Sequence, residues 1–173
     1  ASKKFRDTLT GRKRLVHLLP ILWTELETFL CKDVSRRLFQ GGLPPALLSD
    51  SKNPSFYREW LDSFFARDVQ KLFAFRDADK FNSLFEYLLR QSGGQIETAR
   101  AASELKISRL TVEHHLKALE VMHAVTSLRP FFGGGQKEIV KMPKMYAFDT
   151  GFITFVRGWD PLRPQDHGIL WEH

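Results

Sequence analysis

The segment from residue 97 to residue 121 constrains the fold most, because its apolar residues have the spacing of two short helices joined by a tight turn. In its second half, Val112, Leu116 and Leu119 recur at steps of three and four residues, as on one face of an amphipathic helix. Ser108 stands just before that half, where a hydroxyl can accept a free backbone N–H at a helix start. The pattern predicts a helix-turn-helix, which often presents its second helix to the DNA major groove.

A β-hairpin is predicted directly after this motif. Residues 123–148 lose the helical spacing, and the three glycines at 133–135 separate two segments that are typical of strands. Residues 77–91, upstream, have the apolar spacing of a further helix. Three helices followed by a hairpin make a winged helix, so we expect one at residues 77–148, with the hairpin as its wing.

The first half of the chain is predicted to be mostly helical. Residues 15–19 form a short apolar run ended by Pro20, which predicts a strand, and residues 21–39 predict a helix or a pair of helices. Residues 54–75 carry aromatic side chains at helical spacing, which predicts a long helix whose aromatic stripe is core. The expected fold class is therefore mainly α: a helical bundle followed by a winged helix-turn-helix with a β-hairpin wing.

The net charge of +6 is concentrated at the start of the chain. Residues 1–14 carry six basic residues against Asp7 alone, so this segment has a charge of +5 and the rest only +1. Such an arm can bind phosphate backbones, and it can equally be a solvated tail. The overall charge is therefore no evidence for nucleic-acid binding.

The sequence predicts no membrane partner and no metal site. No apolar run approaches the roughly 18 residues of a membrane span, so we expect a cytoplasmic protein. Cys31 is the only cysteine, which excludes an internal disulfide and a cysteine cluster, and we expect it to be buried. His114 and His115 are adjacent and point about 100° apart on a helix, so they do not share a metal easily.

The candidate DNA contacts lie on the second helix and on the wing. On the helix, Arg109, His114 and Lys117 point away from the apolar stripe, beside Leu110 and Glu113, so this face has mixed charge. The wing is more basic, and its glycine tip can approach a backbone closely. Its candidate residues are Arg129, Lys137, Lys141 and Lys144, against Glu138. We predict weak, salt-sensitive binding to phosphates of double-stranded DNA, with little sequence preference.

Five segments together resemble a known family. They are "LTGRKRLVHLLPILWTE", "FQGGLPPALL", "FFARDVQKLF", "LKISRLTVEHHLKALE" and "KMPKMYAFDTGF", and their order is similar to that in bacterial and archaeal AAA-type ATPases of the DUF 4143 group. In that family a P-loop core precedes a helical lid, a winged helix and a nuclease-like domain. The resemblance implies a remnant of the ATPase core at 1–20, the lid-like region at 21–76, the winged helix at 77–148 and a tail at 149–173 that leads into a truncated domain.

One departure from the family is decisive for chemistry. The sequence holds no G-x-x-x-x-G-K-[ST] loop, so nothing cradles nucleotide phosphates or magnesium, and we expect no enzyme activity and no cofactor in this chain. The resemblance implies ATP and Mg²⁺ for the parent protein only. It also aligns Gly11-Arg12 with a Gly-Arg pair, which makes Arg12 a possible arginine finger of the parent; the alternative is a structural or solvent-exposed arginine.

Three functions follow from these expectations. The first is a winged-helix module of an ATPase that binds DNA through the wing and the recognition helix. The second is an interaction module that docks against other domains of the parent or against a second copy, without binding DNA. The third is a stand-alone transcription regulator, against which the helical region before residue 77 argues.

Overall fold

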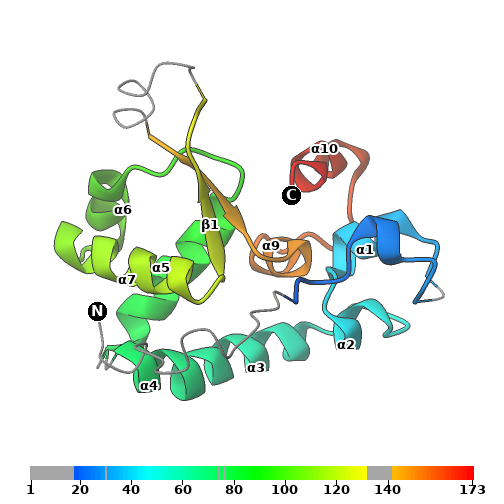
Figure 1. Ribbon diagram of the computed structural model, residues 1–173, viewed down its shortest axis with the longest axis horizontal. Helices are drawn as coiled ribbons and strands as arrows, with labels where there is room; N and C mark the ends of the chain where they lie inside the picture. Colours follow the sequence, from blue (N-terminus) through cyan, green and yellow to red (C-terminus); the bar gives the residue numbers. More distant parts are fainter. Residues whose placement is uncertain (1–17, 30, 74, 76, 132–141) are drawn as a thin grey trace, which may run out of the picture.

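The computed structural model describes residues 18–29, 31–73, 75, 77–131 and 142–173, and it is mainly helical, which confirms the predicted fold class (Figure 1). The elements are η2 (Trp23–Glu25), α1 (Val34–Gln40), α2 (Pro44–Leu47), α3 (Pro54–Phe64), the π-turn η3 (Phe65–Val69), α4 (Gln70–Phe73), α5 (Ala78–Arg90), α6 (Thr98–Leu105), α7 (Arg109–Val121), β1 (Val125–Leu128), β2 (Lys144–Ala147), α9 (Thr150–Val156), η4 (Pro164–Asp166) and α10 (His167–Trp171).

Helices α6 and α7 form the predicted helix-turn-helix. The Ser108 hydroxyl accepts the backbone N–H of Thr111 at 3.0 Å, so the predicted cap starts α7. Lys106 closes α6 in the left-handed region at φ 54°, which turns the chain sharply between the two helices. The stripe on α7 is buried at Val112 and Leu119, as its spacing requires.

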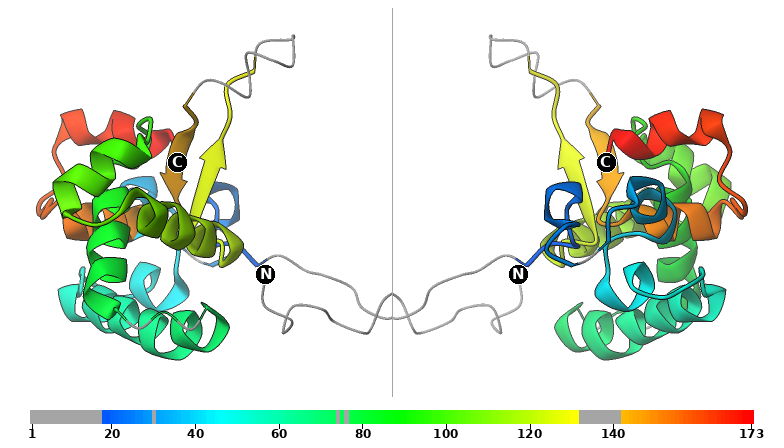
Figure 2. Two further views of the ribbon diagram at one scale, coloured as in Figure 1. Left: turned by 90° about the vertical axis from the view of Figure 1, so that its left-hand side faces the viewer. Right: turned by 90° about the vertical axis from the view of Figure 1, so that its right-hand side faces the viewer.

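The hairpin strands β1 and β2 are antiparallel, with Val125 opposite Ala147. Gln95 adds an isolated bridge to Lys144, so the segment before α6 lies along the second strand. Figures 1 and 2 show the two strands side by side, running out from the helices. The wing is thus confirmed in its two strands, while the predicted glycine tip lies outside the described residues.

One N-terminal prediction is wrong where the structure describes the chain, and a second is narrowed to one of its two alternatives. Leu18 and Leu19 belong to no strand and are 96% and 63% exposed; residues 15–17 lie outside the described part. Just after this run, the Ile21 N–H donates a hydrogen bond to the Gly42 carbonyl at 2.8 Å, and neither residue belongs to a strand. Of the two alternatives for residues 21–39, the structure has a pair of short helical segments, η2 and α1, rather than one helix. The Asp33 carboxylate accepts the Arg36 N–H at 3.1 Å and so starts α1 as a separate helix.

The predicted long helix over residues 54–75 is observed as α3, η3 and α4, and it ends at Phe73. Asn53 caps it and Pro54 occupies its first turn, where a missing N–H costs nothing. Tyr57, Phe64 and Phe65 are buried, which confirms that the aromatic stripe is core. The π-turn η3 adds one residue to a helical turn, and both of its end residues, Phe65 and Val69, are buried.

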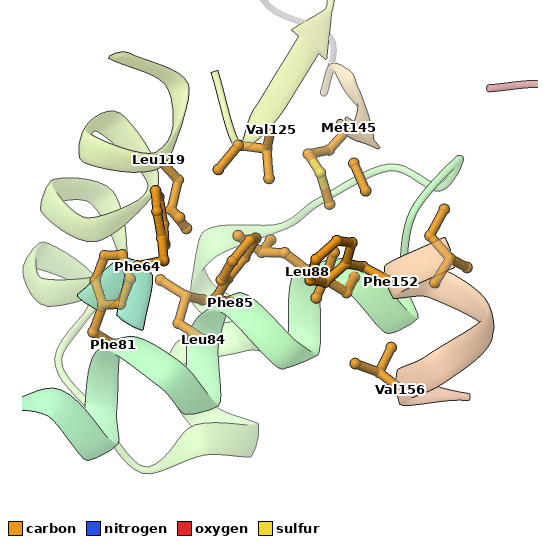
Figure 3. Close-up of a cluster of buried hydrophobic side chains, with 14 of the residues drawn as sticks. Phe64, Phe81, Leu84, Phe85, Leu88, Leu119, Val125, Met145, Phe152 and Val156 are labelled. Atoms are coloured by element: carbon orange, nitrogen blue, oxygen red, sulfur yellow. The ribbon is translucent and has the colours of Figure 1, made fainter. Parts of the chain in front are cut away.

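A large hydrophobic core runs through most of the described helices and both strands, and Val34 packs against both this core and a smaller cluster of Ile21, Leu26, Cys31 and Leu47. Phe81, Phe85 and Leu88 of α5 lie at the centre of the large core, between the side chains of α7 and β1 on one side and Phe152 of α9 on the other (Figure 3). The core crosses residues 76 and 149, where the sequence predicts domain boundaries; that division stays a prediction. None of the helices in the described part combines the length and hydropathy needed to cross a membrane.

Candidate nucleic-acid interface

The outward face of α7 carries its cations already paired. Arg109 Nε lies 2.8 Å from a Glu113 oxygen, and Lys117 Nζ lies 3.4 Å from a Glu120 oxygen. The side chains of Arg109 and Lys117 are 68% and 73% exposed, and His114 is exposed between them. The structure therefore places the three predicted helix residues on one surface, and it neutralises two of them within the helix.

His115 turns the opposite way and belongs to the core. It is 5% exposed and lies against Phe75 and Phe81, with ring centroids 4.5 and 5.4 Å away. Among the described residues its Nδ1 has no hydrogen-bond partner, and burial lowers the pKa of the imidazole, which favours the neutral form. The position of His115, three residues after Val112, places it on the apolar face of the helix and is the sequence signal for this burial.

Of the four predicted wing residues, the structure describes Arg129 and Lys144. Arg129 is exposed just after β1, and Lys144 is the exposed first residue of β2. Lys144 Nζ lies 2.5 Å from a Glu172 oxygen, and this pair raises the pKa of Lys144 and lowers that of Glu172. The predicted contacts Lys137 and Lys141, and the possible arginine finger Arg12, lie outside the described residues.

A buried carboxylate joins two of the five segments that carry the family resemblance. Asp149 is 2% exposed; its carboxylate accepts the N–H of Gly151 at 2.9 Å and so caps α9. It also accepts the N–H of Gly42 at 2.6 Å. A Cβ at Gly41, where φ is +80°, would lie 1.9 Å from the carboxylate, so the close approach requires glycine there.

Arg37 is the charged partner of this junction. Its guanidinium donates to the Ile21 carbonyl at 2.5 Å and to the Thr150 hydroxyl at 3.0 Å. Burial lowers the pKa of Arg37 and raises the pKa of Asp149, and the attraction between the two charges opposes both shifts. The junction holds no exposed nucleophile, so we assign it a structural role.

The half-buried side chain of Lys52 is held by contacts within the fold. Its ammonium donates to the Phe39 carbonyl at 3.2 Å and to the Thr154 hydroxyl, and it lies 4.4 Å from the Phe39 ring centroid. Burial lowers the pKa of Lys52 to about 8. These contacts hold it inside the protein, so it is no phosphate contact. In the described part of the chain no three His, Cys, Asp or Glu side chains gather as metal ligands.

Comparison with known proteins gives one family and few relatives. The family model described as "Domain of unknown function (DUF8612)" matches residues 31–163. Uncharacterized protein Mb2031c of Mycobacterium bovis and uncharacterized protein Rv2008c of Mycobacterium tuberculosis are each 27% identical over 172 residues, which cover 96% of this chain. The chain spans 38% of the length of these curated relatives.

A solved structure, the crystal structure of the transcriptional regulator SlyA, matches with a TM-score of 0.33 and 19% identity. The match covers 68% of this chain and 83% of the SlyA chain.

Proposed function

The chain belongs to the DUF8612 family, a family of unknown function, and we propose from its geometry that its winged helix binds duplex DNA, chiefly through the phosphate backbone. One observation carries the proposal: a capped helix-turn-helix lies beside an antiparallel hairpin, and both present exposed cations. Arg109 and Lys117 lie on the second helix and Arg129 at the wing. This is the arrangement in which a recognition helix enters the major groove and a hairpin grips the adjacent backbone.

The charge pairs on α7 favour phosphate contacts over base reading. Exposed pairs at a helix surface contribute only about 0.3–0.5 kcal/mol, so a phosphate can replace Glu113 or Glu120 at little cost. Glu113 stands on the same outward face and repels a phosphate that comes too close. We therefore expect binding that depends on salt more than on sequence.

Reversing two wing charges tests this function. In the variant Lys137→Glu with Lys141→Glu, we expect duplex affinity at low salt to fall at least about tenfold. The slope of log K against log salt should become about 1.8 smaller, because about 0.9 is lost with each phosphate contact. Both lysines lie between β1 and β2 in the sequence. Fluorescence anisotropy with a labelled duplex at several salt concentrations measures both quantities.

The control carries the same charge change far from the wing. Lys32→Glu with Lys71→Glu alters two exposed lysines, before α1 and on α4, and should lower the affinity less than threefold without changing the slope. Equal losses in both variants would mean that only the overall charge matters. Absence of duplex binding by the unaltered protein at low salt would refute the proposal.

We also propose that the chain acts within a larger ATPase, as its five family-like segments imply. Its relatives are longer, which is consistent with further domains, and the sequence holds no loop for nucleotide phosphates. In this proposal ATP and Mg²⁺ are bound elsewhere in the parent protein, and this chain contributes no catalytic residue. A purified sample of this chain is then expected to show no ATP hydrolysis above buffer.

A second candidate is favoured by Leu110, which is 61% exposed on α7 beside self-paired charges. Such a face suits docking against a second copy or another domain, without DNA. If this face docks against a second copy, Leu110→Asp should abolish self-association in sedimentation velocity at about 100 μM. The aspartate would be an unpaired charge buried in the interface, which costs several kcal/mol. Leu48→Asp, at a 52% exposed site after α2, should leave association unchanged. A monodisperse monomer without affinity for other domains would exclude this candidate.

A further inference from the structure

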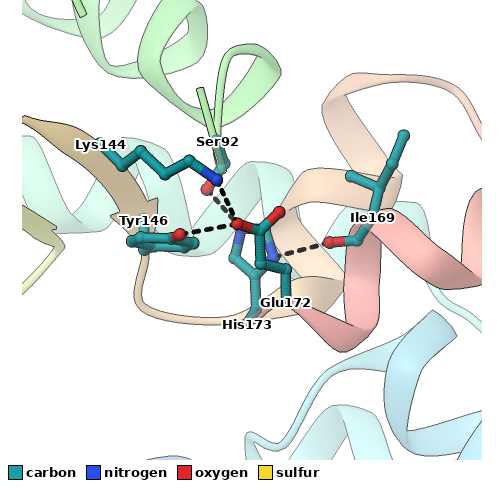
Figure 4. Close-up of polar contacts among 6 residues, drawn as sticks. All are labelled: Ser92, Lys144, Tyr146, Ile169, Glu172 and His173. Carbon is teal, nitrogen blue, oxygen red and sulfur yellow. Dashed lines mark hydrogen bonds and ion pairs between the residues drawn. The ribbon is translucent and has the colours of Figure 1, made fainter. Parts of the chain in front are cut away.

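The end of α10 is attached to the base of the wing at two alternate positions of β2, Lys144 and Tyr146. One Glu172 oxygen accepts both the ammonium of Lys144, at 2.5 Å, and the hydroxyl of Tyr146, at 2.8 Å (Figure 4). The ring of His173 meets that of Tyr146 edge-on, with centroids 5.4 Å apart and planes at 77°. The wing strand therefore presents two convergent donors to a single anionic oxygen.

His173 and Ser92 hold this arrangement in place. His173 Nδ1 lies 3.0 Å from the Ile169 carbonyl, which only accepts, so a neutral ring carries its proton there and Nε2 accepts the Ser92 hydroxyl at 2.6 Å. The Ser92 oxygen in turn accepts the Ala147 N–H at 2.7 Å. Ser92 is 4% exposed, so this pair orients β2 and α10 rather than offering a nucleophile to solvent.

The ion pair of Lys144 and Glu172 remains reachable from solvent, and Tyr146 beside it is half-buried. The side chains of Lys144 and Glu172 are 46% and 45% exposed. Separating them therefore leaves both charges in contact with water, whereas separating a buried ion pair would leave an unpaired charge inside the protein. An exposed pair of this kind adds little to stability, so another anion can displace Glu172 at small cost. A lysine and a tyrosine hydroxyl are also common donors to DNA phosphate oxygens.

We propose that Lys144 and Tyr146 form a phosphate subsite at the base of the wing, and that the Glu172 carboxylate occupies it when no nucleic acid is bound. The proposal rests on the proposed DNA binding, because it adds one phosphate contact to that interface. The carboxylate oxygen stands where a backbone phosphate oxygen would bind. DNA binding and docking of Glu172 then exclude each other, so each weakens the other by the same factor.

A double-mutant cycle tests the subsite with a labelled duplex. Glu172→Gln keeps an acceptor for Tyr146 but removes the competing charge, so affinity at low salt should rise about 3–10-fold and the salt slope should steepen by about 0.9. In a Lys144→Met background the same change should have no effect. Tyr146→Phe should lower the affinity of the Glu172→Gln variant and leave that of the unaltered protein nearly constant.

Glu86→Gln on α5 is the matched control, since it removes the same charge from an exposed pair with Arg90. It should change affinity less than twofold. If Glu172→Gln has no more effect than Glu86→Gln, or acts equally without Lys144, the subsite is refuted while DNA binding stands. If no variant and no unaltered protein binds the duplex at low salt, the proposed function fails and the subsite fails with it.

Discussion

Replacing Asp149 by alanine is expected to lower the free energy of unfolding by about 2–6 kcal/mol, because a buried donor that loses its acceptor costs about 1–3 kcal/mol and two are left here. The carboxylate is 2% exposed and accepts the N–H groups of Gly42 and Gly151. Without it both N–H groups lose their acceptor, and the half-buried guanidinium of Arg37 loses a nearby opposite charge. Urea denaturation followed by circular dichroism measures the change.

Asp33→Ala is the matched control, because Asp33 also caps a helix but does so at an exposed position. Loss of such a cap typically costs about 1 kcal/mol. The Asp149 junction joins segments more than 100 residues apart, with Gly42 and Asp149 separated by 107 positions. If the two variants lose similar stability, Asp149 is only a helix cap, and the link between the turn before α2 and the start of α9 contributes nothing.

The pH dependence of the same site has a defined sign. Burial raises the pKa of Asp149, whereas an unfolded aspartate titrates near 3.9. Just above that value the folded protein holds a proton that the unfolded chain has lost, so stability should fall as the pH rises through this window. Asp149→Asn removes the titration, and the stability difference between the unaltered protein and this variant should shrink with rising pH. A growing difference would mean that Arg37 outweighs burial.

The sequence predicts the features of the fold that depend on residues close together in the chain. The Ser108 cap is visible because the residues that form it lie within three positions of one another, and the stripe of Val112 and Leu119 repeats within one helix. The mixed charge on α7 is likewise local, since Arg109 and Glu113 are four residues apart. These features belong to single elements, so propensity and spacing suffice to predict them.

Contacts between distant segments were beyond the sequence patterns. The apolar run ending at Leu19 has the composition of a strand, yet what it becomes depends on whether a partner strand exists. Lys144 was predicted as a free DNA contact, and only the fold shows that Glu172, 28 positions later, neutralises it. The requirement for glycine at position 41 is not visible in the local sequence either, because the close approach to Asp149 depends on packing across the molecule.

Replacing Phe152 by alanine tests whether the described residues fold as one unit. Phe152 is fully buried in α9; its ring centroid lies 5.2 Å from that of Tyr57, 4.8 Å from Trp60 and 5.0 Å from Phe148. Truncating such a side chain leaves a cavity and typically costs about 3–5 kcal/mol. Because the same core continues to α5 and α7, we expect a single transition, shifted down by about 10 °C.

Amide hydrogen exchange locates the effect of Phe152→Ala along the chain. In one cooperative core the most protected amides of α3 and α7 open only by global unfolding, so their exchange should accelerate by the same factor. Phe131→Ala, at an 89% exposed position, should leave the exchange rates of α3 and of α7 unchanged. Acceleration in α3 and α9 without change in α7 would contradict a shared core. The winged helix at residues 77–148 would then be a separate folding unit, able to move against the helices before it while it holds DNA.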